Sequence, residues 1–187
     1  MYHSRSLFIL LFIFLVLGLF PVNSVAQVGF KHSISASTGI YAAAGLGSNV
    51  YINIRYNHLI DRGTYFFEGA VGLGSIRSDV LESVTAANIF DGNDLFTYEF
   101  LFGYDWRRKG TFPYFVLGFA GINQGGQSRF AGVIGLGKRI LVGGLIESDK
   151  LGLRYDIRDQ IFSQELNNSD SFISHNIVAT IGIEYYF

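Results

Sequence analysis

Three charged residues late in the chain stand at alternate positions. Arg154, Asp156 and Arg158 are each separated by one residue, with Tyr155 and Ile157 between them. On a β-strand, residues two apart point to the same face. This segment would therefore present two guanidinium groups and a carboxylate side by side. Charges taken out of water need partners, so the pattern predicts an ion-pair network, a pore lining or a proton path.

Charged residues also occupy the polar face of other alternating segments. If these faces all turn toward one interior, three arginines meet five carboxylates there, which comes close to neutrality. A closed network of such pairs would fill a narrow interior and leave little room for water. We favour this plugged interior over a pore or a proton path built from the same side chains. The predicted interior residues are Arg55, Glu68, Glu99, Asp105, Arg154, Asp156, Arg158 and Glu184.

Other residue patterns do not predict catalysis, a metal site or a cofactor. Apart from His3, the histidines are His32, His58 and His175, which are scattered and show no metal-ligand spacing. Ser174 directly precedes His175, so the two side chains would point to opposite faces and could not easily share a proton. The absence of Cys excludes disulfides and thiolate metal sites. The Gly-Leu-Gly repeats lack the helix and the Lys-Ser/Thr pair of a phosphate loop.

The composition departs from that of a soluble domain. The 187 residues include 23 Gly and 2 Pro, and 16% are charged while 16% are aromatic. Soluble domains average about 25% charged residues. The formal net charge of −1 offers no polybasic surface, so nucleic acid is not a predicted partner. The length favours one domain.

Residues 1–26 have the pattern of a cleavable signal peptide. Arg5 precedes an apolar run from Leu7 to Phe20, which is shorter than the roughly 20 residues of a spanning helix. Ser24-Val25-Ala26 supplies small residues at the positions that a signal peptidase reads. Cleavage is therefore predicted after Ala26, leaving 27–187 as an exported domain. An uncleaved membrane anchor is the alternative.

In the rest of the chain the hydrophobic pattern has a period of two residues rather than 3.6. The clearest case runs from Phe96 to Trp106, where six aromatic residues occupy consecutive alternate positions. The segment Arg129–Leu141 has an ambiguous facing because Gly and aliphatic residues mix on both sides. The predicted strands are Ile34–Ala44, Val50–Ile60, Thr64–Ile76, Asp94–Arg107, Tyr114–Asn123, Arg129–Leu141, Leu151–Phe162 and Ser171–Phe187.

The predicted connections differ in length. Asp61–Gly63 and Arg108–Phe112 are predicted turns, and Ser78–Asn93 is the longest connection. Gln164–Asp170 is predicted to be a polar loop. Val142–Lys150 is longer than expected, because it falls on the side where a membrane barrel has short periplasmic turns.

Eight alternating strands fit two kinds of barrel with opposite polarity. A lipocalin-like barrel buries its apolar face, whereas a membrane barrel turns that face to lipid. The interior of an eight-stranded barrel is just wide enough to be filled by side chains. The many aromatic residues of one face would overfill it, whereas the Gly, Ala, Ser, Thr and few charges of the other face would fit. We therefore predict an all-β, eight-stranded antiparallel up-and-down transmembrane barrel.

These residues resemble the small outer-membrane β-barrel domains of the OmpA-like and OmpX-like type. The resemblance covers 27–187 and is most specific in the last strand, where Ile181, Ile183 and Tyr185 alternate before Phe187. In that family, such an ending is the signal that the barrel-assembly machinery recognises, which implies this machinery as a partner. The segment from Leu151 to Asp159 is similar to the seventh strand of one subgroup. The resemblance implies a fold rather than a role, since this architecture hosts many functions.

The sequence thus predicts a monomeric, non-enzymatic integral protein of a Gram-negative outer membrane, in contact with its lipid. Its role would be structural, or mediated by the connections Ser78–Asn93 and Gln164–Asp170. A narrow channel for small, including hydrophobic, solutes is the first alternative. A lipid-modifying enzyme is the second.

Overall fold

The structure is a computed structural model that describes residues 29–43, 47–75, 94–106, 113–124, 127–142, 150–166 and 170–187. The expected signal peptide and the predicted connection Ser78–Asn93 lie outside the described residues. Most of the predicted segments Arg108–Phe112 and Val142–Lys150 also lie outside them. Within the described ranges, no helix has the length and the apolar character of a membrane span.

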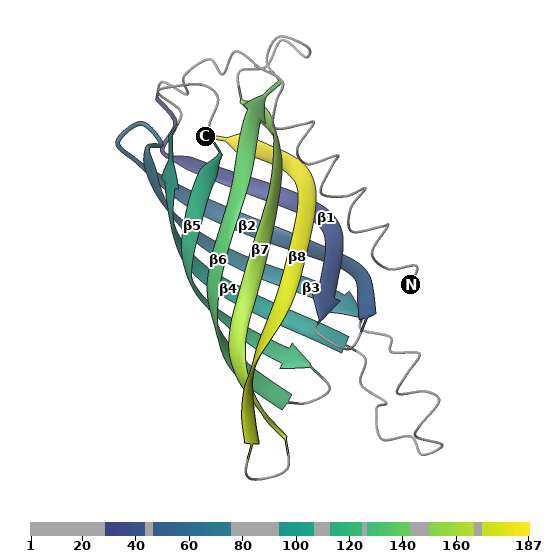
Figure 1. Cartoon of the computed structure of the whole chain (residues 1–187). Helices are drawn as coiled ribbons and strands as arrows, with labels where there is room; N and C mark the ends of the chain where they lie inside the picture. Colours follow the sequence, from purple (N-terminus) through teal and green to yellow (C-terminus); the bar gives the residue numbers. More distant parts are fainter. Residues whose placement is uncertain are drawn as a thin grey trace.

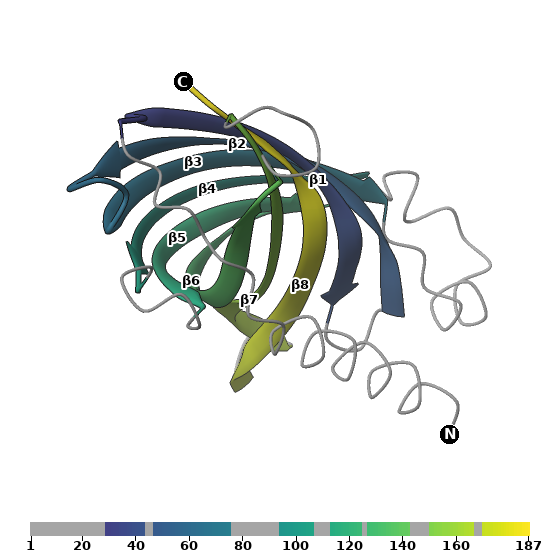
Figure 2. The same ribbon diagram turned by 90° about the horizontal axis from the view of Figure 1, so that it is seen from above.

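Eight antiparallel strands form one closed barrel in which every strand pairs with its neighbours in sequence order. Pairing of the first strand with the last completes the wall, as Figures 1 and 2 show. The predicted eight-stranded all-β fold is therefore confirmed. The strands are β1 (His32–Ala43), β2 (Gly47–Ile60), β3 (Tyr65–Ser75), β4 (Asp94–Asp105), β5 (Tyr114–Gln124), β6 (Gln127–Leu141), β7 (Leu151–Leu166) and β8 (Asp170–Tyr186).

The β1–β8 seam continues to the end of the sequence. His32 donates its backbone N–H to the Phe187 carbonyl at 3.1 Å, and Phe187 donates its own to the His32 carbonyl at 3.0 Å. Since β1 and β8 pair along most of their length, neither is left as an open edge that could template further strands.

The turn between β2 and β3 lies where the sequence predicts a turn. Asp61 and Arg62 have φ angles of 47° and 56°, and Gly63 has a φ of 82°. The Gly63 N–H donates to the Ile60 carbonyl at 3.0 Å. Positive φ at both central residues is the geometry of a type I′ turn, whose twist matches that of the flanking strands. We call the end of the barrel that holds this turn the turn end, and the opposite end the hairpin end.

At the hairpin end, β7 and β8 extend further than the sequence predicts. β7 runs to Leu166 and β8 begins at Asp170, with Gln164 paired to Phe172. The prediction that Gln164–Asp170 is a loop is therefore wrong at both of its ends. Backbone N–H and C=O groups can continue a ladder whatever the side chains are, so polar side chains did not end the strands. Figure 1 shows this β7–β8 hairpin extending past the rest of the wall.

The apolar face of the wall points outward. On β4, Phe96, Tyr98 and Phe100 are exposed, whereas Thr97 and Glu99 between them are buried. The outer surface is not uniform around the barrel. Large aliphatic side chains dominate β8, β1 and β2, namely Ile34, Ile40, Val50, Ile52, Ile54, Ile181 and Ile183. Exposed aromatic side chains are concentrated on β3 and β4, namely Tyr65, Phe67, Phe96, Tyr98, Phe100 and Phe102, and β5 and β6 add Phe119 and Phe130.

The interior is more aromatic than the sequence alone indicates. Buried rings line it beside the expected small residues and charges: Tyr41, Tyr51, Phe66, Tyr114, Phe162 and Tyr186. Glycines on the inner face make room for some of them. A Cβ added at Gly103 would overlap the ring of Phe66, and one added at Gly72 would overlap the hydroxyl group of Tyr51. Rings on some strands therefore fill the space that glycines on neighbouring strands leave open.

Candidate functional site

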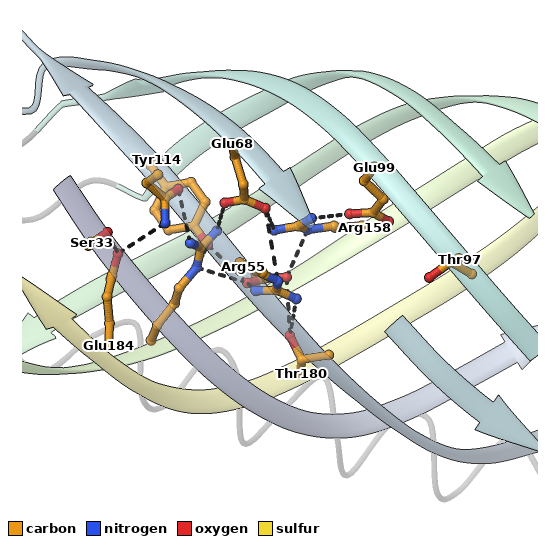
Figure 3. A network of polar contacts seen from close by, with 12 residues as sticks. Ser33, Arg55, Glu68, Thr97, Glu99, Tyr114, Arg158, Thr180 and Glu184 are labelled. Atoms are coloured by element: carbon orange, nitrogen blue, oxygen red, sulfur yellow. Dashed lines mark hydrogen bonds and ion pairs between the residues drawn. The ribbon is translucent and has the colours of Figure 1, made fainter. Parts of the chain in front are cut away.

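A carboxylate at the middle of β7 is the centre of the interior network. Asp156 accepts hydrogen bonds from Arg158 Nε at 3.0 Å, from Arg154 Nε at 3.3 Å, and from Arg55 Nη1. The Tyr114 hydroxyl donates to it at 3.0 Å. Asp156 is buried together with all three arginines. One carboxylate therefore joins arginines from β2 and β7 in a single cluster. Figure 3 shows two of these arginines, Arg55 and Arg158, together with Tyr114.

A second carboxylate connects this cluster to the opposite wall. Glu68 on β3 accepts from Arg154 Nη2 at 2.5 Å and from Arg158 Nη2 at 2.7 Å. Its Oε1 also lies 3.9 Å from Arg55 Nε. Because β3 and β7 are four strands apart in an eight-stranded wall, these ion pairs cross the interior. The crossing occupies the middle of the barrel with charged groups that are paired to each other.

The network continues toward the hairpin end through neutral groups. Arg158 forms an ion pair with Glu99 Oε2. The side-chain amide of Gln160 donates to Glu99 Oε1 at 2.7 Å. The Gln160 carbonyl in turn accepts from the Tyr41 hydroxyl at 2.9 Å. Asn176 donates to that hydroxyl at 2.7 Å. Side chains of β1, β4, β7 and β8 are thereby linked in one chain of hydrogen bonds.

At the turn end, Glu184 is paired with an arginine that the sequence did not single out. Arg139 Nε of β6 lies 3.2 Å from Glu184 Oε2, and Arg139 Nη1 lies 3.7 Å from Asp105. The Ser33 and Tyr186 hydroxyls donate to Glu184 at 2.6 and 2.8 Å. The expectation of three interior arginines was therefore incomplete, because Arg139 is a fourth.

Arg139 was missed because the facing of β6 could not be read from its mixture of Gly and aliphatic residues. One signal was available. Val133, Gly135 and Gly137 share its alternation and are all buried, so a two-residue count from the glycines leads to Arg139. Its guanidinium also lies over the Phe66 ring, at 4.0 Å from the ring centroid.

The structure places all eight predicted interior residues inside the barrel. With Arg139, four arginines face five carboxylates there. Asp105 and Glu184 gather around Arg139, while the other carboxylates gather around β7. Asn57 joins the two groups, because its Oδ1 accepts from Arg139 at 3.0 Å and from Arg154 at 3.4 Å. This arrangement can brace opposite walls and obstruct the interior.

One part of the inner wall carries polar atoms without partners. Among the described residues, the Ser35 and Ser37 hydroxyls and Asn53 Oδ1 are buried and accept or donate no hydrogen bond. Ser37 and Asn53 are cross-strand partners on β1 and β2. These groups lie beside the charged network rather than in it.

The histidines are less scattered than the sequence indicates. His32 and His58 are in contact on the outer face at the turn end. His175, also on the outer face, lies 2.7 Å from Asp159 through its Nδ1, whereas Ser174 is buried on the inner face. In the part of the chain that the structure describes, no three His, Cys, Asp or Glu side chains form a group that could hold a metal ion.

Comparison with solved structures places this fold among known barrels. OprG from Pseudomonas aeruginosa matches with a TM-score of 0.54 at 9% identity, over 86% of this chain and 98% of OprG. The shared fold is that of a small outer-membrane barrel. Neisserial surface protein A (NspA) matches at 17% identity with a TM-score of 0.46, over 85% of this chain and 97% of NspA. The amino-terminal β-barrel domain of P. aeruginosa OprF matches at 14% identity with a TM-score of 0.45, over 83% of this chain and 97% of that domain.

No protein-family model matches the chain, and no curated protein sequence matches it. At 9% identity, the likeness to OprG establishes the fold alone. The predicted resemblance to small outer-membrane barrels is thus confirmed at the level of architecture.

Proposed function

We propose that this chain is an integral protein of a Gram-negative outer membrane, with the apolar wall in contact with lipid. The observation that carries the proposal is the outer surface, where exposed large hydrophobic side chains surround the barrel while most charged side chains of the described strands are buried. Soluble monomers rarely expose contiguous apolar patches of more than a few hundred Å². A closed barrel satisfies its backbone groups internally, which is the requirement for crossing hydrocarbon.

Two further observations support this location. OprG, the P. aeruginosa barrel that shares this fold, is an outer-membrane protein. The amino-terminal sequence has the signal-peptide pattern that export requires. In this proposal the chain acts as a monomer, and the barrel-assembly machinery recognises Ile181, Ile183, Tyr185 and Phe187, whose side chains are exposed on the outer face of the last strand.

Within the membrane, we assign the protein a structural or loop-mediated role with a plugged interior and no enzymatic activity. The ion pairs of Glu68 with Arg154 and Arg158 cross the middle of the barrel. Asp156 fills the space next to them. A buried network of this kind is stable only when its members stay paired, which supports a closed interior at rest.

A narrow channel is the second candidate, and one observation favours it. The unpartnered polar atoms of Ser35, Ser37 and Asn53 lie on one inner wall. Buried polar atoms of this kind are satisfied by water when there is room for it. A row of water molecules along β1 and β2 would provide a path for small solutes beside the ion pairs.

Planar-bilayer recording with purified protein separates these two functions. The plugged barrel is expected to give no discrete conductance, whereas reproducible unitary steps would establish the channel. The location is tested separately by washing membranes at alkaline pH and by comparing heated and unheated samples on a detergent gel. Release by the wash, or equal mobility of the two samples, would contradict the membrane barrel.

A further inference from the structure

Two histidines from different strands meet on the outer face of the barrel at the turn end. His32 of β1 and His58 of β2 are direct cross-strand partners, and their Nδ1 atoms lie 3.4 Å apart. The Leu59 N–H donates to the Lys31 carbonyl at 2.7 Å, which makes that neighbouring pair the hydrogen-bonded one. His32 and His58 are therefore a non-hydrogen-bonded pair, the kind in which facing side chains are closest.

The His32 ring is held by contacts with two other strands. Its Nδ1 lies 2.7 Å from the Tyr56 hydroxyl oxygen, and its ring stacks on that of Tyr56 with 5.8 Å between centroids. On the other side it stacks on Phe187 at 5.7 Å, and the backbones of His32 and Phe187 exchange two hydrogen bonds. The imidazole is thus oriented by β2 and by the last residue of the sequence.

The separation of the two nitrogens suits a shared metal ion. Imidazole nitrogen binds Zn²⁺ at about 2.0–2.1 Å, and two such ligands at a tetrahedral angle are about 3.4 Å apart. Zn²⁺ and Cu²⁺ both accept imidazole ligands, and Cu²⁺ binds a given nitrogen site more tightly. Binding would use the His32 Nδ1 lone pair that now faces the Tyr56 hydroxyl. That hydroxyl group and water can take the remaining positions on the ion.

We propose that His32 and His58 form a binding site for a divalent transition-metal ion, with Zn²⁺ as the ion whose preferred geometry fits their spacing. The bound ion would join β1 to β2 next to the seam where β1 meets β8. This site is distinct from the charged interior, and it does not depend on whether the barrel conducts. Sequence spacing did not reveal it because the two histidines are 26 positions apart, and only the strand register brings them together.

The test uses full-length protein without a polyhistidine tag, stripped of metal with a chelator and held in detergent micelles. Calorimetric titration with Zn²⁺ is expected to show one ion per chain. Titration with Co²⁺ is expected to give the intense visible bands of a tetrahedral site. Replacing one ligand, in His32→Ala or in His58→Ala, should weaken Zn²⁺ binding by at least about tenfold.

His175→Ala is the matched control, because His175 is also an exposed histidine on the outer face but pairs with Asp159. Its Zn²⁺ affinity should equal that of the unmodified protein. Gel mobility before and after heating verifies that each variant is folded, and His58→Gln replaces His58→Ala if the latter fails this check. Equal Zn²⁺ affinity in the unmodified protein and in a folded His32 or His58 variant would overturn the proposal and leave the contact as aromatic packing. Loss of the ion in His175→Ala alone would likewise assign the binding to a different site.

Discussion

Two rows of inward-facing side chains differ in whether their buried polar groups have partners. On β7, Arg154, Asp156 and Arg158 are buried and all of them have ion-pair partners. On β1, the Ser35 and Ser37 hydroxyls are buried and have no partner among the described residues. An uncompensated buried charge costs several kcal/mol, whereas an unpaired hydroxyl costs about 1–3 kcal/mol. In this interior, pairing is therefore compulsory for charges and optional for small hydroxyls.

The largest effect is expected at the centre of the charged row. Asp156→Ala removes the carboxylate shared by Arg55, Arg154 and Arg158, and should lower the free energy of unfolding by about 3–5 kcal/mol. Urea titration in lipid vesicles, followed by gel mobility without heating, measures this loss. Asp156→Asn keeps the volume and one acceptor, so its loss should be smaller. An unchanged urea midpoint for the Ala variant would contradict compulsory pairing.

Glu68→Gln should have the next largest effect. The variant loses the charge that bridges Arg154 and Arg158, but both arginines keep Asp156 as a partner. We expect a loss of about 1.5–3 kcal/mol, the range for hydrogen bonds to charged groups. The same urea titration measures it. A loss greater than that of Asp156→Ala would show that Glu68, and not Asp156, is the centre of the network.

Arg139→Met tests the ion pair at the turn end. The change removes the partner of Glu184 and the stacking on Phe66, while Ser33 and Tyr186 still donate to the carboxylate. We expect a loss of about 1–3 kcal/mol. A double-mutant cycle with Glu184→Gln isolates the coupling between the two residues. It should exceed about 0.5 kcal/mol, as for residues in direct contact. Zero coupling would mean that this ion pair contributes no stability.

The smallest effect is expected in the hydroxyl row. Ser37→Ala removes a buried group that makes no hydrogen bond among the described residues, so the free energy of unfolding should change by less than about 0.5 kcal/mol or rise slightly. Ser33→Ala is the matched control, because the Ser33 hydroxyl donates to Glu184 at 2.6 Å and its loss should be measurable. If Ser37→Ala destabilised the protein as much as Ser33→Ala, the contrast between charges and hydroxyls would fail.

The fold was predictable because one physical rule, alternation along a strand, repeats through the chain. The same rule assigned Arg154, Asp156 and Arg158 to one face. Alternation could not predict the ion-pair partners of these residues, because a partner depends on strand register and on which strands lie on opposite sides of the barrel. Glu184 illustrates this limit: alternation placed it in the interior, but only the structure shows that its ion-pair partner is Arg139.

The alternating hydrophobic pattern also could not predict where strands end or which side chains touch across strands. The polar residues Gln164 and Asp170 continue the β7–β8 ladder, because the Gln164 backbone pairs with Phe172 and the Asp170 backbone pairs with Leu166. The polarity of a side chain does not predict this backbone pairing. His32 and His58 meet because the register of β1 against β2 makes them direct cross-strand partners. Alternation along each strand does not determine that register.

The fit of Phe66 against Gly103 has a consequence for how this sequence can change over time. The two residues are cross-strand partners on β3 and β4, and a Cβ at Gly103 would overlap the Phe66 ring. Neither position can gain volume alone, because a side chain at Gly103 requires a smaller residue at Phe66. Among descendants of this protein, a smaller residue at Phe66 should therefore come before any side chain at Gly103. The order of the two substitutions is fixed by packing.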